Sequence, residues 1–291
     1  MKIYGAAIFA MACWAFSFVW YKVALAYYKP LSLISLRLFF ASFILLAVGL
    51  LFKKRDIIDK ADRKYIFFLA FFEPFLYFLG ESFGMQYVSP TVGALIIATI
   101  PVFTPFFAYI VIRERVTIPN IIGLIISFVG ILILILKKDL SFAAEPIGVA
   151  LMFFAVFSAI GFGLSAKRLA EKYSSLTLIT WQNVIGFFLF LPLFLLFEYD
   201  HFIVVQLDFT IVKTIAELTI FPSIIAYLLL IPVIRELGLS KTNVLVNLIP
   251  IFTAVFAYFM LNEHFTTQKI VGMGVVIIGL FLSQLKMVSG R

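Results

Sequence analysis

The chain has 291 residues, of which 64% are hydrophobic and only 13% are charged. A water-soluble domain is closer to half apolar and a quarter charged, so this composition excludes one. The net charge of +8 does not indicate nucleic acid binding, because the basic residues lie in short loops between apolar runs. The single cysteine, Cys13, can form no internal disulfide.

Apolar runs recur along the whole length, each long enough to cross a hydrocarbon core of ~30 Å. Such segments must be helices, because backbone groups in lipid need hydrogen-bond partners within the segment. The first run lacks a convincing signal-peptide cleavage site, so we expect a retained first helix. The sequence predicts an all-α membrane protein with ten transmembrane helices at 3–27, 32–52, 65–87, 91–112, 119–136, 146–166, 176–197, 212–234, 242–261 and 269–285.

One stretch of the chain occurs twice. Residues 100–117 read IPVFTPFFAYIVIRERVT, and residues 249–266 read IPIFTAVFAYFMLNEHFT, with nine of eighteen positions identical. A looser echo relates Lys22 to Lys167. Self-similarity of this length indicates a duplication, and we place the two copies at 1–140 and 141–291.

The basic residues predict the orientation. If the N-terminus is cytoplasmic, sixteen Lys and Arg residues lie on the inner side and six on the outer side or its rim. This excess supports two cytoplasmic termini in a multi-pass protein of the bacterial inner membrane. Because each copy has five helices, the second copy enters from the opposite face. We therefore expect two inverted repeats around a central cavity.

The repeated stretch carries matched prolines and glutamates. Pro101 and Pro250 each remove a helical hydrogen bond and should kink the fourth and ninth helices. Glu114 and Glu263 end their helices, where the helix dipole disfavours a carboxylate, so each needs a fixed partner. We expect a structural role for both glutamates, because a charge near a membrane surface is tolerated.

Ionisable residues inside predicted helices are the first candidates for function. Glu81 falls at a similar depth to Lys22 and Arg37, so these three residues are expected to form a structural charge cluster. Glu73 lies near mid-membrane with no basic residue at its depth, and Tyr77 and Glu81 follow it on the same helix face. Pro74 follows Glu73 directly and should kink the helix beside the carboxylate.

Two interpretations of Glu73 remain open. It faces the cavity, where it binds the polar end of a substrate or carries a coupling proton, or it is a protonated carboxyl hydrogen-bonded to backbone or to a tyrosine. Weaker cavity candidates are polar or aromatic residues that also serve as contacts between helices. They are Trp14, Thr99, Thr104, Ser223, Tyr227, Asn243 and Asn247, together with Trp181 and Asn183.

The duplicated pattern resembles the EamA family of the drug/metabolite transporter superfamily. The resemblance rests on the tandem five-helix repeat, on Trp14, Lys22 and Arg37, and on the Pro, Glu, Thr, Gly, Gly series that ends each half. It implies a cavity lined mainly by the third, fourth, eighth and ninth helices, with contributions from the first and sixth and with the fifth and tenth at the periphery. Gln182 stands where the second copy would repeat Arg37, so the halves are not expected to be chemically equivalent.

The predicted function is secondary transport, most consistent with export of small polar or amphipathic metabolites such as amino acids by alternating access. An uptake permease or a drug efflux carrier of the same fold remains an alternative. An intramembrane enzyme is disfavoured, because the sequence has neither an HExxH nor a GxSxG arrangement. We expect no cofactor and no metal, a lipid bilayer and a small-molecule substrate as partners, and a monomer or a homodimer.

Overall fold

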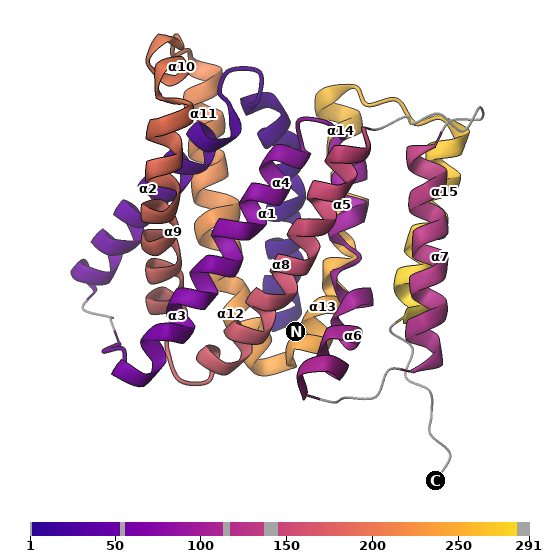
Figure 1. The fold of residues 1–291 in the computed structure, drawn as a ribbon, viewed down its shortest axis with the longest axis horizontal. Helices are drawn as coiled ribbons and strands as arrows, with labels where there is room; N and C mark the ends of the chain where they lie inside the picture. Colours follow the sequence, from indigo (N-terminus) through magenta and orange to yellow (C-terminus); the bar gives the residue numbers. More distant parts are fainter. Residues whose placement is uncertain (1, 53–55, 113–116, 137–144, 284–291) are drawn as a thin grey trace.

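The computed structural model describes residues 2–52, 56–112, 117–136 and 145–283, and their regular structure is helical (Figure 1). Nine helical spans in these ranges are long and apolar enough to cross a membrane. The tenth predicted span is a shorter apolar helix of 17 residues, Thr267–Ser283. The predicted all-α membrane fold is therefore confirmed.

The described part of the first predicted repeat contains seven α-helices. They are α1 (Lys2–Ala24), α2 (Pro30–Leu51), α3 (Arg63–Ala70), α4 (Tyr77–Gly84), α5 (Pro90–Ile97), α6 (Ile100–Ile112) and α7 (Ile118–Ile135). The second contains α8 (Pro146–Ala170), α9 (Ser175–Phe197), α10 (Tyr199–Val204), α11 (Phe209–Leu218), α12 (Ala226–Leu237), α13 (Leu239–Val246), α14 (Leu248–Leu261) and α15 (Thr267–Ser283).

Within the described residues, four of the predicted membrane helices are interrupted. The third and eighth each contain a π-helical segment, Phe71–Leu76 between α3 and α4 and Thr219–Ile225 between α11 and α12. The fourth breaks between α5 and α6 and the ninth between α13 and α14, just before Pro101 and Pro250. Proline lacks an N–H and clashes with the preceding turn, which explains why each break lies on its N-terminal side. The kinks predicted for these two prolines are therefore confirmed.

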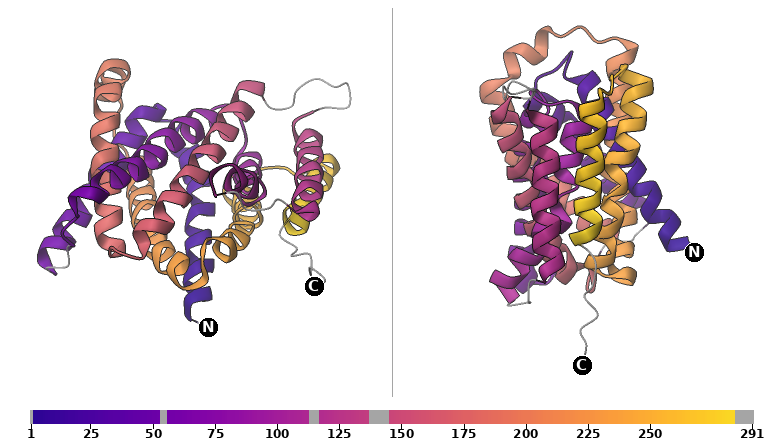
Figure 2. Two further views of the ribbon diagram at one scale, coloured as in Figure 1. Left: turned by 60° about the horizontal axis from the view of Figure 1, so that its bottom comes forward. Right: turned by 90° about the vertical axis from the view of Figure 1, so that its right-hand side faces the viewer.

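Helices α7 and α15 occupy equivalent places in the two copies and pack closely against each other. Figures 1 and 2 show them side by side at one edge of the molecule. A Cβ on Gly123 would lie 2.5 Å from Ser283, and one on Gly130 would lie 2.6 Å from Val276. Because residues early in α7 meet residues late in α15, the two helices run antiparallel. An inverted repeat requires this direction of its duplicated helices.

Polar loops join the two predicted repeats on the side of the molecule where the chain begins. The Lys172 ammonium lies 2.5 Å from Oδ2 of both Asp59 and Asp62. The backbone N–H of Ser174, which caps α9, donates to Asp56 Oδ2 at 2.6 Å. Hydrogen bonding to Ser174 holds the pKa of Asp56 below its ordinary value of 3.8. These contacts fix the start of the third membrane helix against the loop between α8 and α9.

Candidate functional site

The interruption of the third membrane helix places Glu73 at the centre of the bundle. Its backbone is extended, with φ −147° and ψ 115°, and Pro74 follows it within the π-helical segment. Proline removes a helical hydrogen bond at this point, as the sequence predicts. The Glu73 side chain is buried, with only 7% of the residue exposed. A carboxyl at this depth needs a polar partner.

That partner is Tyr227, from the first turn of α12. Its hydroxyl donates a hydrogen bond to Oε1 of Glu73. Two further aromatic rings meet Tyr227 edge-on: Trp14 of α1 with its centroid at 5.2 Å and Phe162 of α8 at 6.0 Å. Sequence reasoning named Glu73, Tyr227 and Trp14 separately, and the structure brings them together. The phenol fixes the carboxyl while the rings surround it with polarisable apolar surface.

A second carboxyl lies two helical turns along from Glu73. Glu81 of α4 accepts a hydrogen bond of 3.0 Å from the hydroxyl of Tyr77 on the same helix. Both residues are buried. The spacing of four residues places Tyr77 and Glu81 on one face of α4, the geometry that the sequence predicts.

The buried guanidinium of Arg37 on α2 completes the charged set. Its Nε and Nη2 donate to the hydroxyl oxygen of Ser223 at 3.3 and 3.1 Å, and its Cζ lies 4.7 Å from the ring centroid of Phe78. The Ser223 hydroxyl in turn donates to the carbonyl of Leu218 at 2.9 Å. Leu218 lies four residues before Pro222. Because proline has no N–H, the Leu218 carbonyl lacks the donor that an α-helix would give it. Ser223 therefore satisfies a carbonyl freed by Pro222 and also holds Arg37.

Apart from Ser223, these side chains line one cavity of about 100 Å³ between the helices. This is room for roughly three water molecules. The lining comes from all the helices that the family resemblance implies, and Arg37 adds α2. The lining residues are Trp14, Ser17, Phe18, Arg37, Glu73, Tyr77, Phe78, Glu81, Ile97, Ile100, Ala159, Phe162, Gly163, Tyr227, Leu230, Ile234, Thr242, Val246 and Ile249.

The expected cluster of Lys22, Arg37 and Glu81 does not form as one unit. Lys22 donates instead to the backbone carbonyls of Met85 and Val88, at 2.9 and 3.2 Å. Among the described residues, no ion pair joins Glu81 to either cation. The difference arises because the buried C-terminal end of α4 offers Lys22 backbone carbonyls that have no partner within the helix. Arg37 and Glu81 share the cavity, whereas Lys22 lies at the end of the bundle.

The weaker cavity candidates have other surroundings. The hydroxyls of Thr99 and Thr104 donate to backbone carbonyls of their own helices, at 2.6 and 2.7 Å. Asn247 is buried at the break between α13 and α14, and its side-chain amide has no hydrogen-bond partner among the described residues. None of these three is among the residues that line the cavity. Trp181 is exposed on α9, and Asn183 donates to Ile179.

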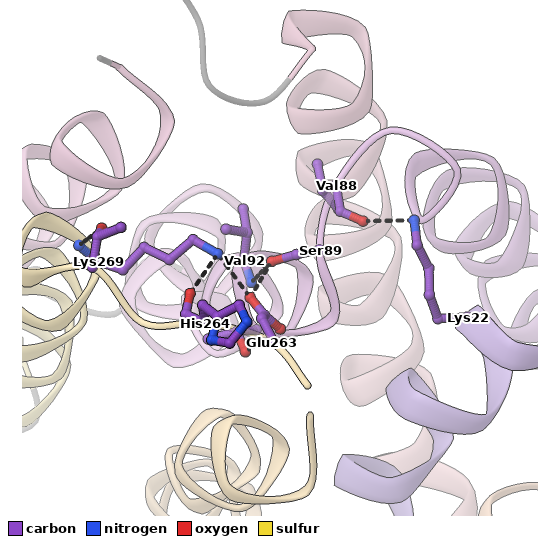
Figure 3. A network of polar contacts seen from close by, with 9 residues as sticks. Lys22, Val88, Ser89, Val92, Glu263, His264 and Lys269 are labelled. Carbon is purple, nitrogen blue, oxygen red and sulfur yellow. Dashed lines mark hydrogen bonds and ion pairs between the residues drawn. The ribbon is translucent and has the colours of Figure 1, made fainter. Parts of the chain in front are cut away.

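Glu263 has the fixed partners that the sequence analysis expects. Its carboxylate accepts hydrogen bonds from the hydroxyls of Ser89 and Thr91 at the start of α5, and it lies 3.2 Å from the ammonium of Lys269 (Figure 3). Glu114 and the side chain of Asn243 lie outside the described part of the chain. Within that part, no cluster of three or more metal-binding side chains occurs.

Sequence reasoning missed most of the uncharged wall of the cavity. Ser17, Phe18, Phe162, Ile234 and Thr242 carry no charge and no rare spacing that distinguishes them from lipid-facing residues. The break at Pro222 did have a signal. Pro222 follows Pro74 by 148 positions, one short of the repeat offset of 149, so the duplication itself points to a matched interruption in the eighth helix.

Comparisons with known proteins agree with this architecture. One solved crystal structure superposes on this chain with a TM-score of 0.65 and 15% sequence identity. The match covers 95% of this chain and 98% of the chain in that structure, which supports the fold. A protein of Archaeoglobus fulgidus named as an uncharacterized transporter is 26% identical over 272 residues, covering 92% of this chain and 94% of the relative.

Further relatives match smaller shares of the chain. The uncharacterized transporter YetK of Bacillus subtilis is 25% identical, over 86% of this chain and 77% of that protein. A chloroplast WAT1-related protein of Arabidopsis thaliana is 28% identical over 68% of this chain, and the match covers 49% of the Arabidopsis protein. The sequence model of the EamA-like transporter family matches this chain twice, over residues 1–136 and 146–285. With both halves matched, the chain belongs to the EamA-like transporter family.

Proposed function

We propose that this transporter exports small polar or amphipathic metabolites such as amino acids by alternating access, with the Glu73 carboxyl as the substrate-binding or proton-carrying group. The observation that carries the proposal is the burial of Glu73 at a helix break, inside a cavity, with the Tyr227 hydroxyl as its hydrogen-bond partner. Broken membrane helices at mid-depth form substrate and ion sites in secondary transporters.

The chemistry of the cavity supports a substrate with both charge signs and an apolar part. Glu73 and Glu81 supply carboxyls, and Arg37 supplies a guanidinium that can bind a carboxylate through two parallel hydrogen bonds. Trp14 and Phe162 offer ring faces to an ammonium group or to an apolar side chain. An amino acid has all of these features.

We further propose two inverted repeats at 1–140 and 141–291 in a bacterial inner membrane, with both termini cytoplasmic. The sixteen inner basic residues and the antiparallel α7 and α15 support this topology. A proton is the proposed coupling ion, because a buried carboxyl can bind and release one during a transport cycle.

Glu73→Gln tests the proposed function. Glutamine keeps the volume and an oxygen that accepts from Tyr227, but it cannot titrate. The assay is exchange of a panel of labelled amino acids by reconstituted vesicles, with and without an imposed proton gradient. We expect the wild-type protein to move at least one solute unchanged and Glu73→Gln to abolish gradient-driven transport while its melting temperature is retained.

Glu217→Gln is the matched control, because it removes a carboxylate that pairs with Lys213 on the outside of α11. This variant should transport as the wild type does. Unchanged transport and unchanged gradient dependence in Glu73→Gln would refute the role proposed for Glu73. Chemical conversion of the solute during exchange would instead indicate an enzyme.

A further inference from the structure

The helices around the cavity pack into two groups, each containing elements of both predicted repeats. In the α8 group, α3, α4 and α5 pack against α8, and in the α1 group, α11, α12 and α14 pack against α1. The two groups meet along α5, which also packs against α14 and α1. Gly80 shows how tightly the first group is built, since a Cβ there would lie 2.6 Å from the Leu151 carbonyl oxygen. The cavity lies between the two groups, and both contribute to its lining.

A lysine of the α1 group binds the end of a helix in the α8 group. Lys22, in the last turn of α1, donates to the carbonyls of Met85 and Val88, which follow α4. The last carbonyls of a helix have no partner within the helix and carry partial negative charge. An ammonium group is therefore well placed there.

A carboxylate of the α1 group binds the start of the next helix in the α8 group. Glu263 follows α14, and its Oε1 and Oε2 accept from the hydroxyls of Ser89 and Thr91 at 2.8 and 2.9 Å. Ser89 is the N-cap of α5, so the carboxylate lies at the positive end of that helix. The Glu263 side chain is only 9% exposed, so solvent screens its interaction with the end of α5 only weakly.

The two contacts hold one short turn from both sides. A cation binds the C-terminal end of α4 and an anion binds the N-terminal end of α5, and only the turn from Met85 to Ser89 separates them. Figure 3 shows Lys22, Val88, Ser89 and Glu263 in this arrangement. Both charges match the dipole of the helix end that they meet. Moving the α1 group away from the α8 group at this end would break both contacts together.

From these contacts, the cavity extends toward the side of the molecule where the chain begins. Lys22 lies at the end of α1 opposite to Lys2, whereas the lining residues Ile234 and Thr242 lie at the junction of α12 and α13. That junction follows an even number of spans, so it is on the side where the chain begins. The cavity of about 100 Å³ is also smaller than the roughly 300–1,000 Å³ of typical ligand pockets, so we expect the two groups to move apart when a solute binds or leaves.

We propose that Lys22 and Glu263 form a latch that closes the cavity at the end opposite to the N-terminus. The latch consists of these two side chains, the hydroxyls of Ser89 and Thr91, and the carbonyls of Met85 and Val88. Opening this end requires its release, and closing it requires its formation. The inference rests on the proposed alternating access and adds the residues that control one of its two gates.

The test measures access rather than transport. In a Cys13→Ala background, Ser17→Cys places a single thiol on the cavity wall. A membrane-impermeant maleimide is added to reconstituted vesicles from the side of the latch or from the opposite side. We expect Glu263→Gln and Lys22→Met each to raise the labelling rate from the latch side about tenfold, because each removes a charge-assisted contact that favours the closed state.

Glu217→Gln again serves as the control, since it removes a carboxylate from a pair within one helix, and it should label as the wild type does. Thr91→Val removes one donor and should raise the rate about fivefold, even if Glu263→Gln does not fold. Wild-type rates from the latch side in the folded variants would overturn the latch. Because labelling needs no substrate, this outcome is distinguishable from failure of the transport role proposed for Glu73.

Discussion

Gly80→Ala should separate the helix that carries Tyr77 and Glu81 from its neighbour α8. A Cβ at Gly80 would lie 2.6 Å from the Leu151 carbonyl oxygen and 2.7 Å from the Ala155 backbone nitrogen. Both atoms belong to backbone, so no side chain can rotate away to make room. The 2.6 Å contact has to open to at least 3.0 Å, which moves one helix against the other.

Overpacking of this kind costs about 1–3 kcal/mol in well-packed protein interiors. We therefore expect a lower melting temperature for Gly80→Ala in detergent, measured by the loss of the monodisperse peak in size-exclusion chromatography after heating. We also expect slower transport, because the shift displaces Glu81 within the cavity.

Gly274→Ala is the matched control for this substitution. A Cβ on Gly274 meets no atom within 4 Å, so alanine there should be neutral or slightly stabilising in helix α15. Equal melting temperatures for Gly80→Ala and the wild type would refute the reasoning. The same conclusion would follow if the Gly274→Ala control lost as much stability as Gly80→Ala.

Two further predictions concern polar contacts. Ser223→Ala leaves two donors of Arg37 without their acceptor, which should destabilise the protein by about 1–3 kcal/mol in a melting assay, and an unchanged melting temperature would contradict this. Asp56→Asn tests the contact between Asp56 and the cap of α9. Hydrogen bonding to Ser174 lowers the pKa of Asp56, so the carboxylate stabilises the folded state above pH 3.8. This stabilisation is lost as the pH falls through the lowered pKa and the carboxylate is protonated. The variant should be less stable than wild type at neutral pH and lack this acid-dependent loss, as melting curves recorded across pH would show.

The membrane fold could be predicted from the sequence because bilayer thickness sets the length of each apolar run. The kinks at Pro74, Pro101 and Pro250 could be predicted as well, since proline acts on its own helix and needs no tertiary information. Helix α15 begins at Thr267, two residues before the predicted start at 269. Helix ends depend on local capping, which hydropathy does not reveal.

The candidate site was predictable only in part. Glu73 was identified because an acid at mid-membrane is rare, but its partner Tyr227 is 154 residues away, and depth alone could not select it among many tyrosines. Lys22 was assigned to the wrong neighbours, because the depth of a residue along a helix does not determine the direction in which its side chain leaves the helix axis. The free carbonyls after α4 compete for the same ammonium, and only the packed structure reveals them.

The packing of α7 against α15 has a consequence for how such a chain can arise. Each helix meets its own duplicate, so glycines from one ancestral sequence supply both faces of the contact. A half-length chain inserted into a bilayer in both directions could therefore form the same antiparallel pair from two separate molecules. After fusion the two halves can diverge in sequence. One difference between them is Arg37, whose matched position in the second half is Gln182.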